Sequence, residues 1–156
     1  MKTIIALLIL LTAPLFSQSF ILDVSYYRAE NDMNRTTRTE TFSVSGYASA
    51  YSIKYGGKVM PNEQNEEKTC DLSQASLDEI LASVKDNKIA QNEVFYAKEK
   101  TNGAETFYLT IKVNMVLDGS PYEIILDGEA NLVKGNKMYL KVIELIKDLR
   151  RIIKNC

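Results

Sequence analysis

The sequence predicts an α+β domain: an antiparallel sheet of about six strands backed by two α-helices, in the order βββαβββα. Two amphipathic stretches predict the helices, and two glycine-containing turns that agree on one register predict half of the sheet. The 156-residue chain is 46% hydrophobic and 25% charged, a composition typical of globular proteins. We therefore expect a single domain over residues 20–156, after a signal segment over residues 1–19.

The first 19 residues predict an export signal. Lys2 precedes an almost continuous apolar run from Ile4 to Phe16, and small polar residues at 17–19 follow as a cleavage region. The run is about 13 residues long, whereas a membrane-spanning helix needs about 20. We expect a bacterial protein, exported to the periplasm or the extracellular space, that keeps no stable membrane span after cleavage. An uncleaved membrane anchor is the alternative.

Two stretches have the apolar spacing of amphipathic helices. The first follows the capping residue Ser73 and ends near Asn87, and the second follows Gly135-Asn136. Their stripes consist of Leu77, Ile80, Leu81 and Val84 in the first helix, and of Val142, Leu145, Ile146, Leu149, Ile152 and Ile153 in the second. Both stripes indicate core-facing surfaces, although a strand over 139–145 is an alternative.

Two hairpin turns, Asn102-Gly103 and Asp118-Gly119, predict a three-stranded meander. Across the first turn the expected pairs are Val94 with Ile111 and Tyr96 with Leu109; across the second they are Met115 with Tyr122, Val113 with Ile124, and Ile111 with Leu126. Both registers put apolar residues on the same face of the shared central strand.

The N-terminal half predicts three more strands, over 20–30, 37–45 and 47–55, followed by a polar loop over 57–69. The triplet Glu40-Thr41-Phe42 recurs as Glu105-Thr106-Phe107, and the same shift superimposes the two helical stripes. An internal βββα duplication is a hypothesis that explains both matches; coincidence is the alternative.

Cys70 and Cys156 are the two cysteines of the chain. In an oxidising compartment such a pair predicts a disulfide, with two free thiols or a bond from Cys156 to another chain as the alternatives. An intramolecular bond would join the start of the first helix to the end of the second. Helices packed side by side under this constraint would run antiparallel.

The composition excludes several kinds of function. The chain has no histidine, which excludes Ser-His-Asp and Cys-His catalysis and any His-ligated metal. Nineteen Lys and Arg against 20 Asp and Glu leave no basic surplus for nucleic acid. Phosphate loops, nucleotide fingerprints, zinc spacings and calcium loops are missing from the sequence. We expect no cofactor, no metal and no nucleic-acid partner.

Tyr47, Tyr51 and Tyr55 recur at a spacing of four and are expected on one face of one strand. Tyrosine offers a large, rigid contact area with a polar tip, so the pattern predicts a binding face for a protein, a peptide or a glycan. Ordinary packing of a half-buried strand explains the same spacing.

The carboxylates Asp127 and Glu129 share a predicted strand face near Glu123 and are the candidate catalytic pair. A solvated strand face is the simpler interpretation, and the sequence therefore favours a non-enzymatic protein. Our first hypothesis is an exported binding or interaction protein, inhibitor-like in kind, with an unknown partner. The alternatives are a carboxylate-based hydrolase of envelope or extracellular polymers and a small-ligand carrier.

Overall fold

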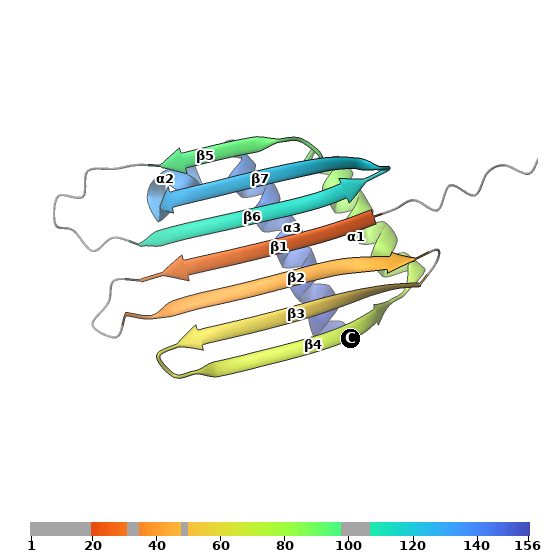
Figure 1. Ribbon diagram of the computed structural model, residues 1–156, viewed down its shortest axis with the longest axis horizontal. Helices are drawn as coiled ribbons and strands as arrows, with labels where there is room; N and C mark the ends of the chain where they lie inside the picture. Colours follow the sequence, from red (N-terminus) through yellow and green to blue (C-terminus); the bar gives the residue numbers. More distant parts are fainter. Residues whose placement is uncertain (1–19, 31–34, 48–49, 98–106) are drawn as a thin grey trace, which may run out of the picture.

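The computed structural model describes residues 20–30, 35–47, 50–97 and 107–156, and these form one β-sheet with helices on one of its faces (Figure 1). The strands are β1 (Phe20–Ala29), β2 (Thr37–Tyr47), β3 (Ala50–Met60), β4 (Gln64–Leu72), β5 (Glu93–Ala97), β6 (Tyr108–Leu117) and β7 (Ser120–Glu129). The helices are α1 (Gln74–Asp86), α2 (Ala130–Gly135) and α3 (Lys137–Asn155). The predicted α+β class is confirmed.

The seven strands lie in the order β4-β3-β2-β1-β6-β7-β5. All neighbours are antiparallel except β5, which pairs with β7 in parallel. Strand β1 therefore lies in the middle of the sheet, between β2 and β6.

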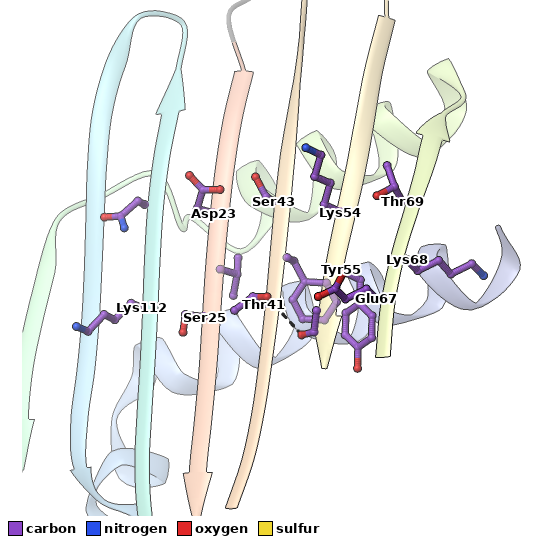
Figure 2. Close-up of a pocket in the computed structure, with 14 residues that line it drawn as sticks. Asp23, Ser25, Thr41, Ser43, Lys54, Tyr55, Glu67, Lys68, Thr69 and Lys112 are labelled. Carbon is purple, nitrogen blue, oxygen red and sulfur yellow. Dashed lines mark hydrogen bonds between the residues drawn. The ribbon is translucent and has the colours of Figure 1, made fainter. Parts of the chain in front are cut away.

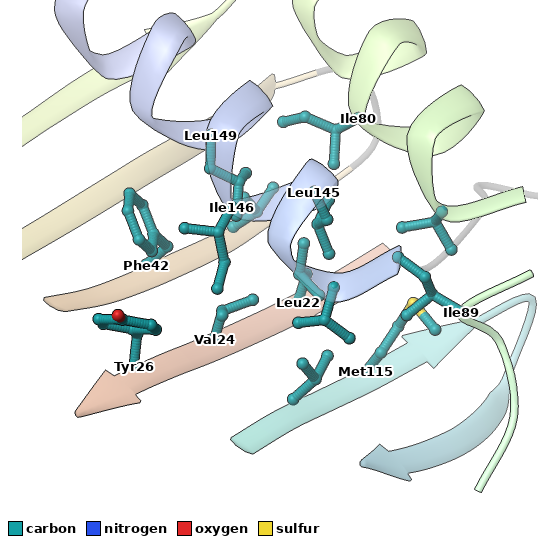
Figure 3. Close-up of a cluster of buried hydrophobic side chains, with 14 of the residues drawn as sticks. Leu22, Val24, Tyr26, Phe42, Ile80, Ile89, Met115, Leu145, Ile146 and Leu149 are labelled. Atoms are coloured by element: carbon teal, nitrogen blue, oxygen red, sulfur yellow. The ribbon is translucent and has the colours of Figure 1, made fainter. Parts of the chain in front are cut away.

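Alternation of side chains along the strands places the core between the sheet and the helices. In β1, Phe20, Leu22 and Val24 are buried, whereas Ile21 and Asp23 are exposed on the opposite face. Figure 3 shows such strand residues packed beneath the buried stripe of α3 and beside Ile80 of α1. The core is filled largely by aliphatic residues that are almost completely buried.

Helices α1 and α3 cross the covered face in opposite directions (Figure 1). Helix α1 leads from β4 at one edge of the sheet to β5 at the other, and α3 ends beside β4. The predicted helix boundaries are confirmed: the Ser73 side chain accepts a hydrogen bond from the Ser76 amide, Asn87 caps the end of α1, and the Asn136 side chain caps α3. Residues 139–145 are helical.

The hairpin across Asp118-Gly119 has the register predicted from sequence. Met115 pairs with Tyr122, Val113 with Ile124, and Ile111 with Leu126. Both turn residues have positive φ, 51° for Asp118 and 76° for Gly119, as a tight β-hairpin turn requires.

The predicted pairing of β5 with β6 is wrong. Val94 pairs with Ile125 of β7 instead of Ile111, and both Val94 and Tyr96 are exposed. The free edge of β6 is occupied by β1, so β5 adds outside β7. The Asn102-Gly103 turn on which the prediction depended lies outside the described residues.

The predicted polar loop over 57–69 is also wrong, because β3 continues to Met60 and β4 begins at Gln64. Strand β4 lies at an edge of the sheet, where charged residues such as Glu66 and Glu67 are tolerated and discourage pairing with other chains.

Because β4 is a strand, the element order is ββββαβββαα, not βββαβββα. The internal duplication is not confirmed, and Glu105 and Thr106 lie outside the described residues.

A disulfide joins Cys70, near the end of β4, to Cys156 at the C-terminal end of α3, with 6.2 Å between their Cα atoms. It closes a loop of 86 residues that contains α1, three strands and both later helices.

Across the described residues, no helix is long and apolar enough to cross a membrane.

We expect Leu126→Asp to unfold the domain, because Leu126 is 0% exposed and an unpaired buried charge costs several kcal/mol. The matched control is Ile125→Asp, on the same strand but on the uncovered face. Urea unfolding followed by circular dichroism compares them. Equal destabilisation by the two changes would contradict the register.

Reduction of the disulfide should lower the free energy of unfolding, by at most about 4–5 kcal/mol on a chain-entropy argument. The variants Cys70→Ala and Cys156→Ala should each resemble the reduced protein, and the double variant should be no less stable than Cys70→Ala alone. Thiol titration of denatured, unreduced protein should find no free thiol; two titratable thiols would refute the bond.

Candidate functional site

Among the described residues, no helix covers the face of the sheet opposite α1 and α3 (Figure 1), and this face is called the uncovered face below. The strand registers arrange its side chains in rows that run across the sheet. One row contains Thr69, Lys54, Ser43, Asp23 and Asn114, and the next contains Glu67, Gly56, Thr41, Ser25 and Lys112. The centre of this face is thus rich in hydroxyl groups and carries charges of both signs.

These two rows line a shallow groove of about 490 Å³ (Figure 2). Its lining includes Gly56, where a Cβ atom would lie 2.8 Å from the Thr41 hydroxyl oxygen. The Thr41 hydroxyl donates to the Gly56 carbonyl oxygen at 3.3 Å. The space beside Gly56 is therefore taken up by the Thr41 hydroxyl, which a side chain at this position would have to displace.

The charged groups of the groove are available to a ligand. No ion pair joins Lys54, Lys112 or Asp23 to another residue within the described ranges. Ser43 separates Lys54 from Asp23 in their row, so the ammonium and the carboxylate stand on either side of a hydroxyl group. This alternation of donors and acceptors suits a polar, extended ligand.

Apolar side chains lie on the same face toward β5. Val94 and Tyr96 of β5 and Tyr108 of β6 are exposed by 55%, 59% and 41% of their surfaces. Exposed apolar groups beside a polar groove are a common feature of interaction surfaces.

The candidate carboxylates Asp127 and Glu129, for which the sequence favours a solvated strand face, also lie on the uncovered face, in β7. Asp127 accepts hydrogen bonds from the hydroxyls of Thr110, at 2.5 Å, and Tyr108, at 2.8 Å. The bond to Asp127, followed by burial, raises the pKa of Tyr108. Glu129 is the residue from which α2 starts, and Glu123 lies beside Asn114. The Asp127 carboxylate is therefore held as a hydrogen-bond acceptor for two side chains of β6.

The three tyrosines predicted to form a binding face do not share one strand face. Strand β2 continues through Tyr47, which pairs with Ala50, so the turn comes after Tyr47 instead of before it. Tyr47 is 86% exposed, whereas Tyr51 is buried in the core. Tyr55 follows Tyr51 on the helix side of β3 and packs against Phe42 with 5.2 Å between ring centroids.

A buried carboxylate, Glu40, lies under α3 and is 3% exposed. Both of its oxygens accept hydrogen bonds from the Arg150 guanidinium, one of them at 3.2 Å from Nε, and the Tyr55 hydroxyl donates at 3.4 Å. Burial, and then the charge of Glu40, raise the pKa of Tyr55. This pair was not predicted from the sequence, although Glu40 shares its strand face with Phe42 and Val44 and is thus a charge on an apolar face.

The other basic residues near the end of α3 have ordinary surface roles. Arg151 pairs with Glu79 of α1 and with Asp148. Lys154 is exposed. The described residues contain no group of three or more cysteine, aspartate and glutamate side chains positioned to hold a metal ion.

Comparison with known proteins gives no match among protein-family models, curated proteins or solved structures.

The Glu40–Arg150 pair should behave as a coupled unit. Arg150→Met leaves a buried carboxylate and should destabilise the fold by about 2–4 kcal/mol. Glu40→Leu combined with Arg150→Met should cost less than Arg150→Met alone, because no buried charge is left. Urea unfolding of both single variants and the double variant measures the coupling energy. Additive effects would show that the pair does not interact.

Proposed function

We propose that this chain is an exported, non-enzymatic binding protein that recognises an extended polar ligand, a peptide or a glycan, on the uncovered face of its sheet. The observation that carries the proposal is the groove over β4, β3, β2, β1 and β6. There Lys54, Lys112 and Asp23 alternate with hydroxyl groups and form no ion pair within the described part of the chain.

Export is supported by two independent features. The first 19 residues have the pattern of a signal peptide. The Cys70–Cys156 disulfide is typical of proteins that fold in an oxidising compartment.

Binding at the surface, without catalysis, fits the remaining features. The chain has no histidine, and the Asp127 carboxylate is already engaged by Thr110 and Tyr108. Large side chains such as Phe20, Phe42 and Met138 fill the space between the sheet and the helices, which favours the groove over an internal carrier site.

Binding can be tested with peptide and glycan arrays probed by the mature protein and by two charge-reversal variants. The double variant Lys54→Glu with Lys112→Glu reverses two charges of the groove. It should no longer bind the arrayed ligands that the native protein binds. Lys85→Glu with Lys137→Glu makes the same charge change on exposed positions of α1 and α3 and should leave binding intact.

Equal binding by both double variants would refute recognition in the groove. Turnover of an arrayed glycan that is lost in Asp127→Asn would favour the hydrolase instead. Retention of an apolar small molecule by the native protein, unaffected by either charge reversal, would favour the carrier.

A further inference from the structure

A second cavity, of about 320 Å³, opens on the helix side of the sheet, where β1 and β3 end and β2 begins, at the left of Figure 1. Its lining combines three arginines with one carboxylate and apolar walls: Tyr26, Arg28, Glu30, Thr36, Arg38, Val59 and Arg150. It is separated from the polar groove by the sheet itself, since the two lie on opposite faces.

Two of the arginines face each other directly. Arg28 of β1 and Arg38 of β2 are cross-strand partners, and both side chains belong to the helix-facing side of the sheet. Like charges directly opposite each other in a sheet are destabilising. Arg150 of α3 brings a third guanidinium to the same cavity.

The nearby carboxylates do not balance these three charges. Glu30 pairs with Arg28, and both carboxylate oxygens of Glu40 accept hydrogen bonds from Arg150. The Arg38 Nε lies 4.0 Å from Glu40, which is beyond hydrogen-bond distance. Among the described residues, three arginines and two carboxylates leave one surplus positive charge. Arg38, whose side chain is 60% exposed and which meets Glu40 only at 4.0 Å, can therefore bind an anion.

Two of the three arginines of the cavity are held against aromatic rings. The Arg150 guanidinium lies over the ring of Tyr26, 5.6 Å from its centroid, and the Arg28 guanidinium lies over Phe107 at 5.7 Å. The Arg28 Nε is buried and has no hydrogen-bond acceptor within the described ranges. These two stacked guanidinium groups border the cavity, and the planar guanidinium of Arg38, which also lines it, can bind a planar oxyanion through two parallel hydrogen bonds.

We propose that this cavity binds the carboxylate of a small organic acid. The carboxylate would accept two hydrogen bonds from Arg38 and relieve its repulsion with Arg28, while the apolar body of the acid would lie against Tyr26 and Val59. A single negative charge matches the single surplus positive charge. The volume is at the lower end of the range of small-molecule sites. The site is independent of the groove and does not rest on the function proposed for it.

The test uses the mature protein with its disulfide intact, titrated with sodium benzoate, sodium acetate, sodium phosphate or sodium chloride at equal ionic strength. Thermal unfolding and heteronuclear NMR both report binding. Benzoate should raise Tm in a saturable way and shift the amide signals around Arg28 and Arg38. Acetate should bind the same site more weakly, because it lacks the apolar body.

Arg38→Gln separates a binding role from a structural one. Without ligand its Tm should equal or exceed that of the native protein, because a like-charge contact is removed, and its response to benzoate should disappear. Arg38→Lys keeps the charge without the planar fork and should bind benzoate about tenfold more weakly. The control Lys147→Gln removes a cation of α3 that pairs with Glu144 outside the cavity, and it should respond like the native protein.

Three results would overturn the proposal. One is a benzoate response no larger than that of chloride. The second is an undiminished response in Arg38→Gln, or an equal loss in Lys147→Gln. The third is tighter binding of phosphate than of benzoate, which would assign the cavity to a more highly charged anion.

Discussion

The fold depends on the packing of α3 across the full width of the sheet. At one end, the capping residue Asn136 donates to the Glu93 carboxylate of β5 at 3.0 Å; at the other, Cys156 is bonded to Cys70 of β4. A helix of 19 residues is about 28 Å long, and seven strands at a spacing of about 4.8 Å are about 29 Å wide from edge to edge. The length of α3 thus matches the number of strands that it covers, and the Glu40–Arg150 pair fixes its position in between.

Two long helices on one face leave the other face to water, and this asymmetry determines where ligands can reach the molecule. Strand β2 illustrates the division, because consecutive residues serve opposite sides. Arg38 and Glu40 belong to the helix-side cluster, whereas Thr41 and Ser43 line the polar groove. Alternate residues of β2 therefore line different sites: the two proposed sites share the backbone of this strand but none of its side chains. Strands β1 and β3 also line both sites, so a ligand in one site can influence the other through the positions of these three strands.

The sequence predicted what local patterns determine and failed where distant segments compete for the same edge. Some features depend only on neighbouring residues or on simple chemistry, and the structure has all of those predicted. They are the caps at Ser73 and Asn136, the apolar stripe of α3, the hairpin at Asp118-Gly119 and the cysteine pair. The position of β5 depends on β1 taking the free edge of β6, which no local pattern encodes. Strand β4 was missed because an edge strand needs little apolar alternation. The arginine cluster required knowing that Arg28, Arg38 and Arg150 converge, and they are far apart in the chain.

The central place of β1 has a consequence for how the chain reaches its fold. Phe20, at the start of β1, pairs with Leu117, at the end of β6, so the middle of the sheet joins segments that are synthesised far apart in time. At about 5–20 residues per second, the ribosome needs on the order of 5–20 s to make the intervening chain. Until then β1 exposes one unpaired edge, and the stripe that will cover its apolar face has not been translated. A nascent chain of this protein therefore cannot complete its sheet before β6 is made, nor cover it before α3 is made, so an apolar strand face is exposed during synthesis.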